Sequence, residues 1–157
     1  MTMTATDPTM AIDPTMAIPT TSSALLDRIR ELELASRSLD PDEAERPFAA
    51  ALAEKLLLAR YFHARCRALG FEVGPPPELS IVTFRWAPPG AGAAAVDAMN
   101  RAILDGVRRD GRVFLSSTTL DGRFVLRLAV LPFRTHLRTV DDALEVLGEQ
   151  IRAQPSH

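Results

Sequence analysis

The sequence predicts an α+β domain, with a small antiparallel or mixed sheet and helices packed on one face, preceded by a disordered leader and an N-terminal helix. The first observation is the period of the apolar residues, which predicts helix, strand, strand, helix, strand, strand, helix along the main part of the 157-residue chain. The second is the pair Asp121-Gly122 between two extended segments, which is typical of a tight hairpin turn. Such an order of elements buries one sheet face under helices.

Composition limits the class of protein. With 46% hydrophobic and 24% charged residues, the chain has the balance of one soluble globular domain. A formal net charge of -2 argues against a nucleic-acid partner, since binding to phosphate backbones requires a basic excess. The single cysteine, Cys66, excludes an internal disulfide framework. No window approaches the roughly 20 apolar residues of a membrane span, so we expect a cytoplasmic protein without membrane contact.

The first 22 residues are predicted to form a disordered leader. They contain a tandem hexapeptide, at 7–12 and 13–18, whose repeated prolines oppose both helix and strand. The expected organisation continues with an N-terminal helix and acidic joint over 23–46, a main domain over 47–153 and a tail over 154–157.

Two helices are predicted before the sheet. Ser22 or Ser23 can cap the first, which is expected to begin near Ala24. Its apolar face comprises Leu25, Leu26, Ile29 and Leu32. The second helix follows Pro47 and is stopped by Gly70. Lys55, the only lysine, lies within or beside its apolar stripe, where the methylenes are expected to pack while the ammonium reaches water.

The remaining segments alternate between extended and helical patterns. Strands are predicted at 71–73, 79–86, 113–119 and 124–130. A helix over 93–109 has its packed face at Val96, Met99, Ile103 and Val107, and a final helix is expected to begin near Thr139, with Val140, Leu144, Leu147 and Ile151 on its apolar face.

The strand at 124–130 places a cation on one sheet face. Alternation directs Phe124, Leu126, Leu128 and Val130 to the helices and Val125, Arg127 and Ala129 to the opposite side. A long cation in mid-strand requires water or a carboxylate, because burying it unpaired is costly. Arg127 is therefore the candidate binding residue of that face.

The stretches 75–86 and 111–130 resemble the C-terminal small domain of group II pyridoxal-phosphate (PLP)-dependent amino acid decarboxylases, the aromatic-L-amino-acid decarboxylase relatives. The resemblance extends from about 47 to 151. Residues 25–33 and 39–46 resemble the N-terminal helical segment of bacterial members. In that family the large domain holds PLP as a Schiff base on the lysine of a His-Lys pair, and this sequence contains no His-Lys pair and no counterpart of that domain.

The resemblance implies a role for Arg127. Leu126-Arg127-Leu128 matches a family strand whose arginine enters the active site and is implicated in holding a substrate carboxylate. A solvent-facing or interface arginine is the alternative. Phe114, Thr118 and Gly122 look like packing and turn residues, and Arg134-Thr135 is interpreted as a helix-start or salt-bridge pair.

These observations lead to two hypotheses. The first is a remnant or fragment of a PLP-dependent decarboxylase for aromatic or related L-amino acids, inactive alone, with no catalytic, cofactor or metal residue of its own and no PLP bound. The second is a non-catalytic interaction module that forms a homodimer or pairs with an intact decarboxylase subunit through the sheet face around Arg127.

Three other constellations are weak. His63 and Cys66 lie one helical turn apart, but two ligands make no metal site, so a core or surface pair is the better interpretation. His136 with Ser116, Ser117 and Asp121 lacks the nucleophile elbow of a hydrolase. Phe84 and Trp86 could stack nucleic-acid bases only on an open sheet face, and the net charge of -2 opposes nucleic-acid binding.

Overall fold

The structure, a computed structural model, describes residues 21–37, 46–130 and 134–154, apart from the side chains of residues 33, 35–37 and 46–50. The elements are α1 (Ser22–Arg37), α2 (Arg46–Ala68), β1 (Glu72–Val73), β2 (Ile81–Arg85), α3 (Ala93–Asp110), β3 (Ser116–Leu120), β4 (Arg123–Ala129) and α4 (Leu137–Arg152). The predicted leader lies outside the described residues, except for its last two, Thr21 and Ser22. None of the described helices has both the length and the apolar character needed to cross a bilayer.

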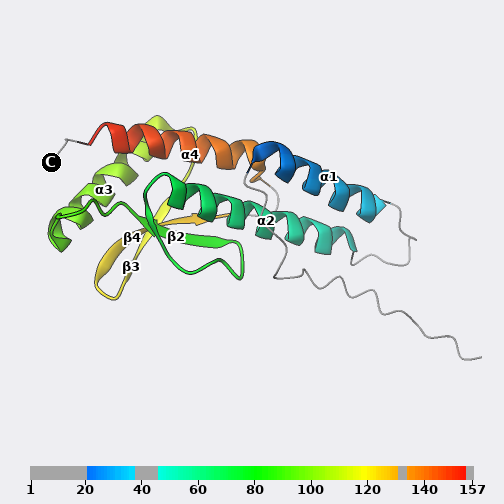
Figure 1. Cartoon of the computed structure of the whole chain (residues 1–157), viewed down its shortest axis with the longest axis horizontal. Coiled ribbons are helices and arrows are strands. Elements are labelled where there is room, and N and C mark those ends of the chain that lie inside the picture. Colours follow the sequence, from blue (N-terminus) through cyan, green and yellow to red (C-terminus); the bar gives the residue numbers. More distant parts are fainter. Residues whose placement is uncertain (1–20, 38–45, 131–133, 155–157) are drawn as a thin grey trace, which may run out of the picture.

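The four strands form one open antiparallel sheet in the order β1-β2-β4-β3. Strands β2 and β3 both run antiparallel to β4, so α3 connects two parallel strands that have β4 between them. Helices α2, α3 and α4 lie on one side of the sheet, and α1 lies along α2, beyond the start of α4 (Figure 1). The predicted α+β architecture is confirmed.

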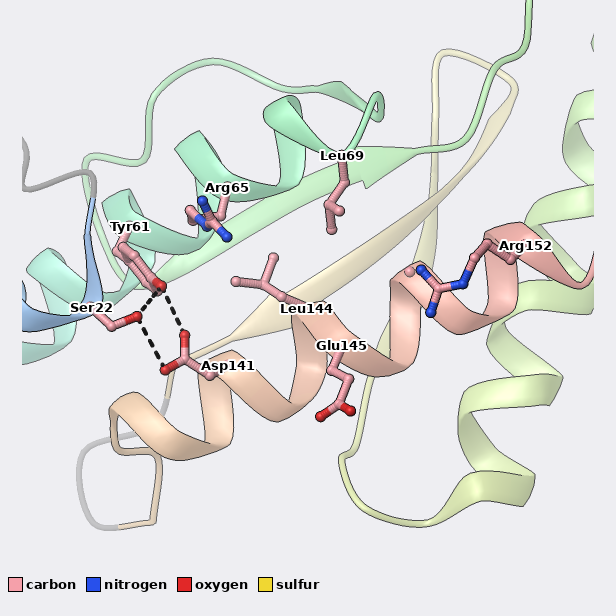
Figure 2. Close-up of a pocket in the computed structure, with 9 residues that line it drawn as sticks. Ser22, Tyr61, Arg65, Leu69, Asp141, Leu144, Glu145 and Arg152 are labelled. Carbon is pink, nitrogen blue, oxygen red and sulfur yellow. Dashed lines mark hydrogen bonds between the residues drawn. The ribbon is translucent and has the colours of Figure 1, made fainter.

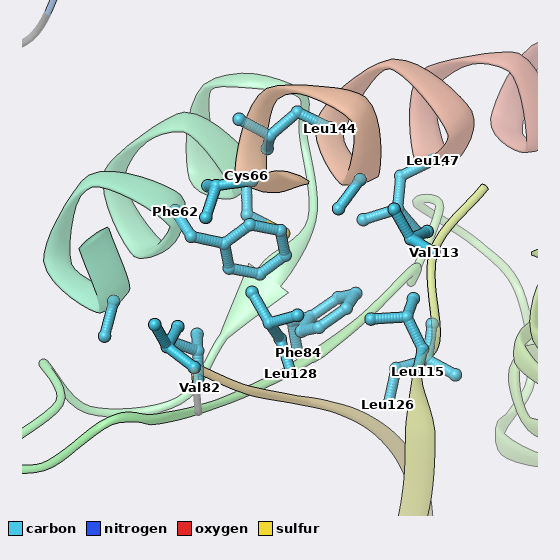
Figure 3. Packing of buried hydrophobic residues seen from close by; sticks show 14 of the residues in the cluster. Phe62, Cys66, Val82, Phe84, Val113, Leu115, Leu126, Leu128, Leu144 and Leu147 are labelled. Atoms are coloured by element: carbon cyan, nitrogen blue, oxygen red, sulfur yellow. The ribbon is translucent and has the colours of Figure 1, made fainter. Parts of the chain in front are cut away.

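The buried face of the sheet is centred on Phe84 in β2. Its ring meets Phe62 of α2 edge-on at 5.2 Å between centroids, and Phe71 meets it at 5.4 Å. Leu126 and Leu128 of β4 are buried beside it, below α2 and α4 (Figure 3). The side of β4 predicted to face the helices is therefore the buried side, since hydrophobic area is removed from water only there.

Helix α3 is attached to β2 by a buried amide. Asn100 is fully buried and accepts a hydrogen bond from the Trp86 backbone N–H at 2.8 Å, while its Nδ2 donates to the carbonyls of Trp86 and Val96. The apolar pattern missed this position and included Met99, which is only half-buried, although the predicted Val96, Ile103 and Val107 are buried. A polar side chain is tolerated there because all three hydrogen bonds are made.

Glycines end two of these elements. At the end of α2, Gly70 has φ +94°, and the N–H groups of Gly70 and Phe71 bond to the carbonyls of Arg67 and Cys66. This is the Schellman arrangement expected of a C-terminal glycine. In the β3–β4 turn, Asp121 and Gly122 have φ 50° and 74°, as the predicted hairpin requires.

The starts of α1 and α4 differ from the prediction. Helix α1 begins at Ser22, and the hydroxyl nearest its first-turn amides is that of Thr21, which accepts from the Ala24 N–H at 3.4 Å. Leu26, expected on the apolar face of α1, is 41% exposed. Helix α4 begins at Leu137, two residues before the expected Thr139, because Leu137 is itself buried in the core.

Candidate functional site

Arg127 lies on the face of the sheet away from the helices. Its register partners are Thr83 on β2 and Ser116 on β3, so all three side chains point to this open face. The Arg127 Nε donates to Ser116 Oγ at 3.0 Å, and Ser116 Oγ donates to the Arg127 carbonyl at 3.3 Å. Within the described part of the chain, no carboxylate pairs with this half-buried guanidinium. Most of its donors are therefore available for an acceptor from outside.

The open face is less exposed around Val125 than the sequence suggests. Alternation places Val125 on this face with Arg127 and Ala129, but Val125 is only 8% exposed, so the face is not bare at this position. The register explains the burial, since Thr118 lies opposite Val125 on β3 and Arg85 lies one position beyond the last β2–β4 pair. Val125 and Arg85 line a shallow cavity of about 210 Å³ on this face.

Arg85 is a buried cation that sequence reasoning missed. It is 8% exposed and lies 3.6 Å from the Glu72 carboxylate and 3.8 Å from that of Asp97. Its Nε and Nη1 make no hydrogen bond with any described residue. The alternation of β2 and the pairing of Glu72 with Arg85 could have located it, but nothing local indicated that a carboxylate of α3 lies nearby.

Lys55 departs furthest from its prediction. The side chain is 1% exposed, so its ammonium does not reach water as expected. Lys55 Nζ donates to Glu54 Oε2 at 2.7 Å and to the Thr135 carbonyl at 2.8 Å. A buried ammonium requires such partners, and Thr135 supplies one from the turn before α4. The other oxygen of Glu54 lies 3.4 Å from His136 Nδ1.

A second polar cluster joins α1 to the domain (Figure 2). Tyr61 donates its phenolic proton to Asp141 Oδ1 at 2.8 Å, and Ser22 Oγ lies 2.7 Å from the phenol oxygen. These side chains lie in a groove of about 410 Å³ between α2 and α4, whose wall includes Leu144. Burial raises the pKa of the Tyr61 phenol above its ordinary value; the Ser22 hydrogen bond opposes this effect, and Asp141 reinforces it.

The weaker sequence constellations have structural roles. His63 Nε2 donates to the Gly74 carbonyl at 2.9 Å, and burial raises the pKa of the Cys66 thiol far above its ordinary value. Among the described residues, no group of three or more potential ligands could hold a metal ion. His136 faces Glu54 rather than the serines, and Phe84 is in the core rather than on an open face.

No protein-family model matches the chain, but curated enzymes are similar to about half of it. Tryptophan decarboxylase 2 of Oryza sativa subsp. japonica is 41% identical over 80 residues, which is 51% of this chain and 16% of that enzyme. Aromatic-L-amino-acid decarboxylase of Catharanthus roseus is 33% identical over 84 residues, 52% of this chain and 17% of the enzyme. The chain thus spans about a sixth of these relatives.

Solved structures have a similar fold over about two thirds of this chain. The structure of Oryza sativa TDC with PLP and tryptamine superimposes with a TM-score of 0.61 at 25% identity, covering 65% of this chain and 22% of the other. Catharanthus roseus tryptophan decarboxylase in complex with L-tryptophan gives 0.60 at 26% identity, covering 66% and 22%.

The fold and its open face define a two-layer α+β domain whose mid-sheet arginine bonds to a serine and, among the described residues, to no carboxylate. Over about half of its length, this chain is similar to group II PLP-dependent amino acid decarboxylases.

We expect Lys55→Met to lower the free energy of unfolding by about 3 kcal/mol, because Glu54 and the Thr135 carbonyl lose a buried charged partner. Chemical denaturation measures the change. Arg67→Met is the matched control, since Arg67 is an exposed cation on the same helix. Equal stability of the wild type and Lys55→Met would contradict the structural role of this ion pair.

We expect Tyr61→Phe to cost about 1 to 2 kcal/mol at neutral pH, through loss of the hydrogen bonds to Asp141 and Ser22. Because folding raises this pKa, the stabilisation is fully present below the unfolded tyrosine pKa of about 10 and is lost as pH rises through the folded value. Denaturant titrations between neutral and strongly alkaline pH should therefore show a steeper alkaline decline for the wild type. An identical pH slope in the variant would contradict this assignment.

Proposed function

We propose that this chain is a remnant or fragment of a PLP-dependent amino acid decarboxylase, corresponding to the small C-terminal domain over 47–153 with an N-terminal helix and acidic joint over 23–46. The ancestral reaction is loss of carbon dioxide from an aromatic or related L-amino acid. The similarity to tryptophan and aromatic-L-amino-acid decarboxylases supports the class of substrate. A cytoplasmic location, a disordered leader at 1–22 and a tail at 154–157 belong to the same proposal.

The environment of Lys55 supports inactivity of the chain alone. It is the only lysine in the sequence, and its amine is buried and hydrogen-bonded to Glu54 and Thr135. A Schiff base requires a neutral amine that can approach an aldehyde carbon, and neither condition fits this ammonium. The described residues therefore do not fit PLP as a covalently held cofactor.

Arg127 supports descent from a substrate-binding domain. Among the described residues, its guanidinium bonds to a serine and to no carboxylate. It therefore retains the donors needed to bind a carboxylate. We assign it the substrate-carboxylate role within a complete enzyme.

The decisive experiment is reaction of the folded chain with PLP, followed by borohydride reduction and peptide mapping. We expect no saturable, stoichiometric labelling of Lys55, together with no release of carbon dioxide from aromatic L-amino acids. Labelling in denaturant is the positive control, since unfolding removes both hydrogen bonds of the amine. Stoichiometric labelling of the native chain with decarboxylation would overturn the proposal.

The second candidate function is a non-catalytic module that pairs with itself or with an intact decarboxylase through the open sheet face. The 47% exposure of Ile81 and the Arg127 guanidinium, which has no carboxylate partner among the described residues, favour it, since a mixed apolar and charged patch is a suitable contact surface.

We expect Arg127→Glu to weaken an association through the open face while leaving the thermal midpoint nearly unchanged, because the helix-facing side of β4 is untouched. Sedimentation of the chain, alone and with an intact aromatic amino acid decarboxylase, measures the effect. Arg67→Glu on α2 is the control for charge alone. A monomeric wild type that does not shift on adding the decarboxylase would leave this candidate without support.

A further inference from the structure

Strand β3 is an edge of the sheet with outward-facing backbone groups. Among the strands that the structure describes, it pairs only with β4, and the hairpin formed by these two strands projects away from α1, α2 and α4 (Figure 1). In a two-residue hairpin the residues flanking the turn, Leu120 and Arg123, exchange hydrogen bonds, and the pattern alternates from there. Ser117 and Thr119 therefore direct their N–H and C=O groups away from β4. No hydrogen bond between described residues uses these groups.

The strand lacks the usual protection of an edge. Residues Ser116–Leu120 read Ser-Ser-Thr-Thr-Leu, without charge or proline, whereas exposed edges are ordinarily blocked by lysine, proline or a bulge. Two apolar side chains are exposed to solvent at its ends, Phe114 just before the strand at 81% exposure and Leu120, its last residue, at 46%. The exposure of Phe114 shows that its interpretation as a packing residue was wrong.

Both apolar side chains lie on the same face of the sheet. Leu120 pairs with Arg123 and Ser116 with Arg127, so both β3 residues point to the open face. Phe114 is two residues before Ser116 and is exposed, whereas Val113 and Leu115 on either side are buried, so it shares that face.

One register of self-pairing uses all of these features. A two-fold axis through Ser117 in an antiparallel pair places Phe114 opposite Leu120, and Ser116 opposite Thr118, twice in each dimer. The outward N–H and C=O groups of Ser117 then hydrogen-bond to those of Ser117 in the second copy. The outward groups of Thr119 face those of Leu115 in the second copy. An axis through Thr118 would place Phe114 opposite Gly122 and leave its ring uncovered.

We propose that β3 pairs antiparallel with β3 of a second copy of this chain, with the axis at Ser117, to form a continuous eight-stranded sheet. The occupant is a second copy because the edge is self-complementary in this register: each exposed Phe114 meets an exposed Leu120. An uncharged strand also offers no selectivity for an acidic or a basic peptide. The pairing leaves Arg127 and the centre of the open face uncovered, so it is separate from an open-face association.

Opposite charges introduced at positions 114 and 120, which face each other across the axis, test the register. Sedimentation equilibrium of the full chain is expected to show a wild-type dimer, weakened about tenfold or more by Phe114→Lys or Leu120→Glu, a change equal to about 1.4 kcal/mol. The double variant Phe114→Lys/Leu120→Glu is expected to recover most of the affinity, because each lysine then faces a glutamate. Leu79→Lys is the control, since Leu79 is equally apolar and 70% exposed but precedes β2. Circular dichroism verifies that each variant is folded.

Four outcomes would count against the proposal. The first is a wild type that remains monomeric at millimolar concentration. The second is a double variant no better than either single change, which would show that Phe114 and Leu120 do not meet. The third is dissociation by Arg127→Glu but not by Phe114→Lys, which would assign the dimer to the open face. Binding of an unrelated peptide strand by a monomeric chain would also count against a second copy as the occupant.

Discussion

The edge-on contacts of Phe84 with Phe62 and Phe71 hold the sheet against α2, and the arrangement of the other elements depends on this one-sided burial. Aromatic pairs of this geometry add about 0.5 to 1.5 kcal/mol each to the hydrophobic gain of burial. Because the helices occupy one face, the polar side chains of β2, β3 and β4 must lie on the other. The connection through α3 then places β4 between β2 and β3, which makes β3 an edge.

Much of this fold could be predicted from local patterns. The alternation along 124–130 identifies the buried side of β4, and Asp121-Gly122 identifies the turn. These features are determined by residues close in sequence, so period and turn chemistry are sufficient. Asn100 shows the limit of that approach, because a hydrophobic pattern has no place for a polar core residue whose partners are backbone groups of Trp86, just after β2.

The polar contacts could not be predicted, since they join residues far apart in sequence. The Lys55 amine bonds to the carbonyl of Thr135, 80 positions away, and Ser22 lies beside Tyr61, 39 positions away. The position of a lysine at the boundary of an apolar stripe is compatible with either an exposed or a buried ammonium. Burial of Lys55 depends on the Thr135 carbonyl, which the segment before α4 supplies. The same is true of Phe114, whose exposure depends on the absence of a covering element among the described residues rather than on its own sequence context.

The two arginines of the open face differ in a way that bears on function. Arg85 is 8% exposed between Glu72 and Asp97, so its charge is already compensated and its donors are largely withdrawn from solvent. Arg127 has only a serine hydroxyl within the described residues and is half-buried. An incoming carboxylate would have to compete with two carboxylates at Arg85 but with none at Arg127. A guanidinium binds a carboxylate in bidentate fashion only while its planar donors are free, so an acid at this face would meet less competition at Arg127 than at Arg85.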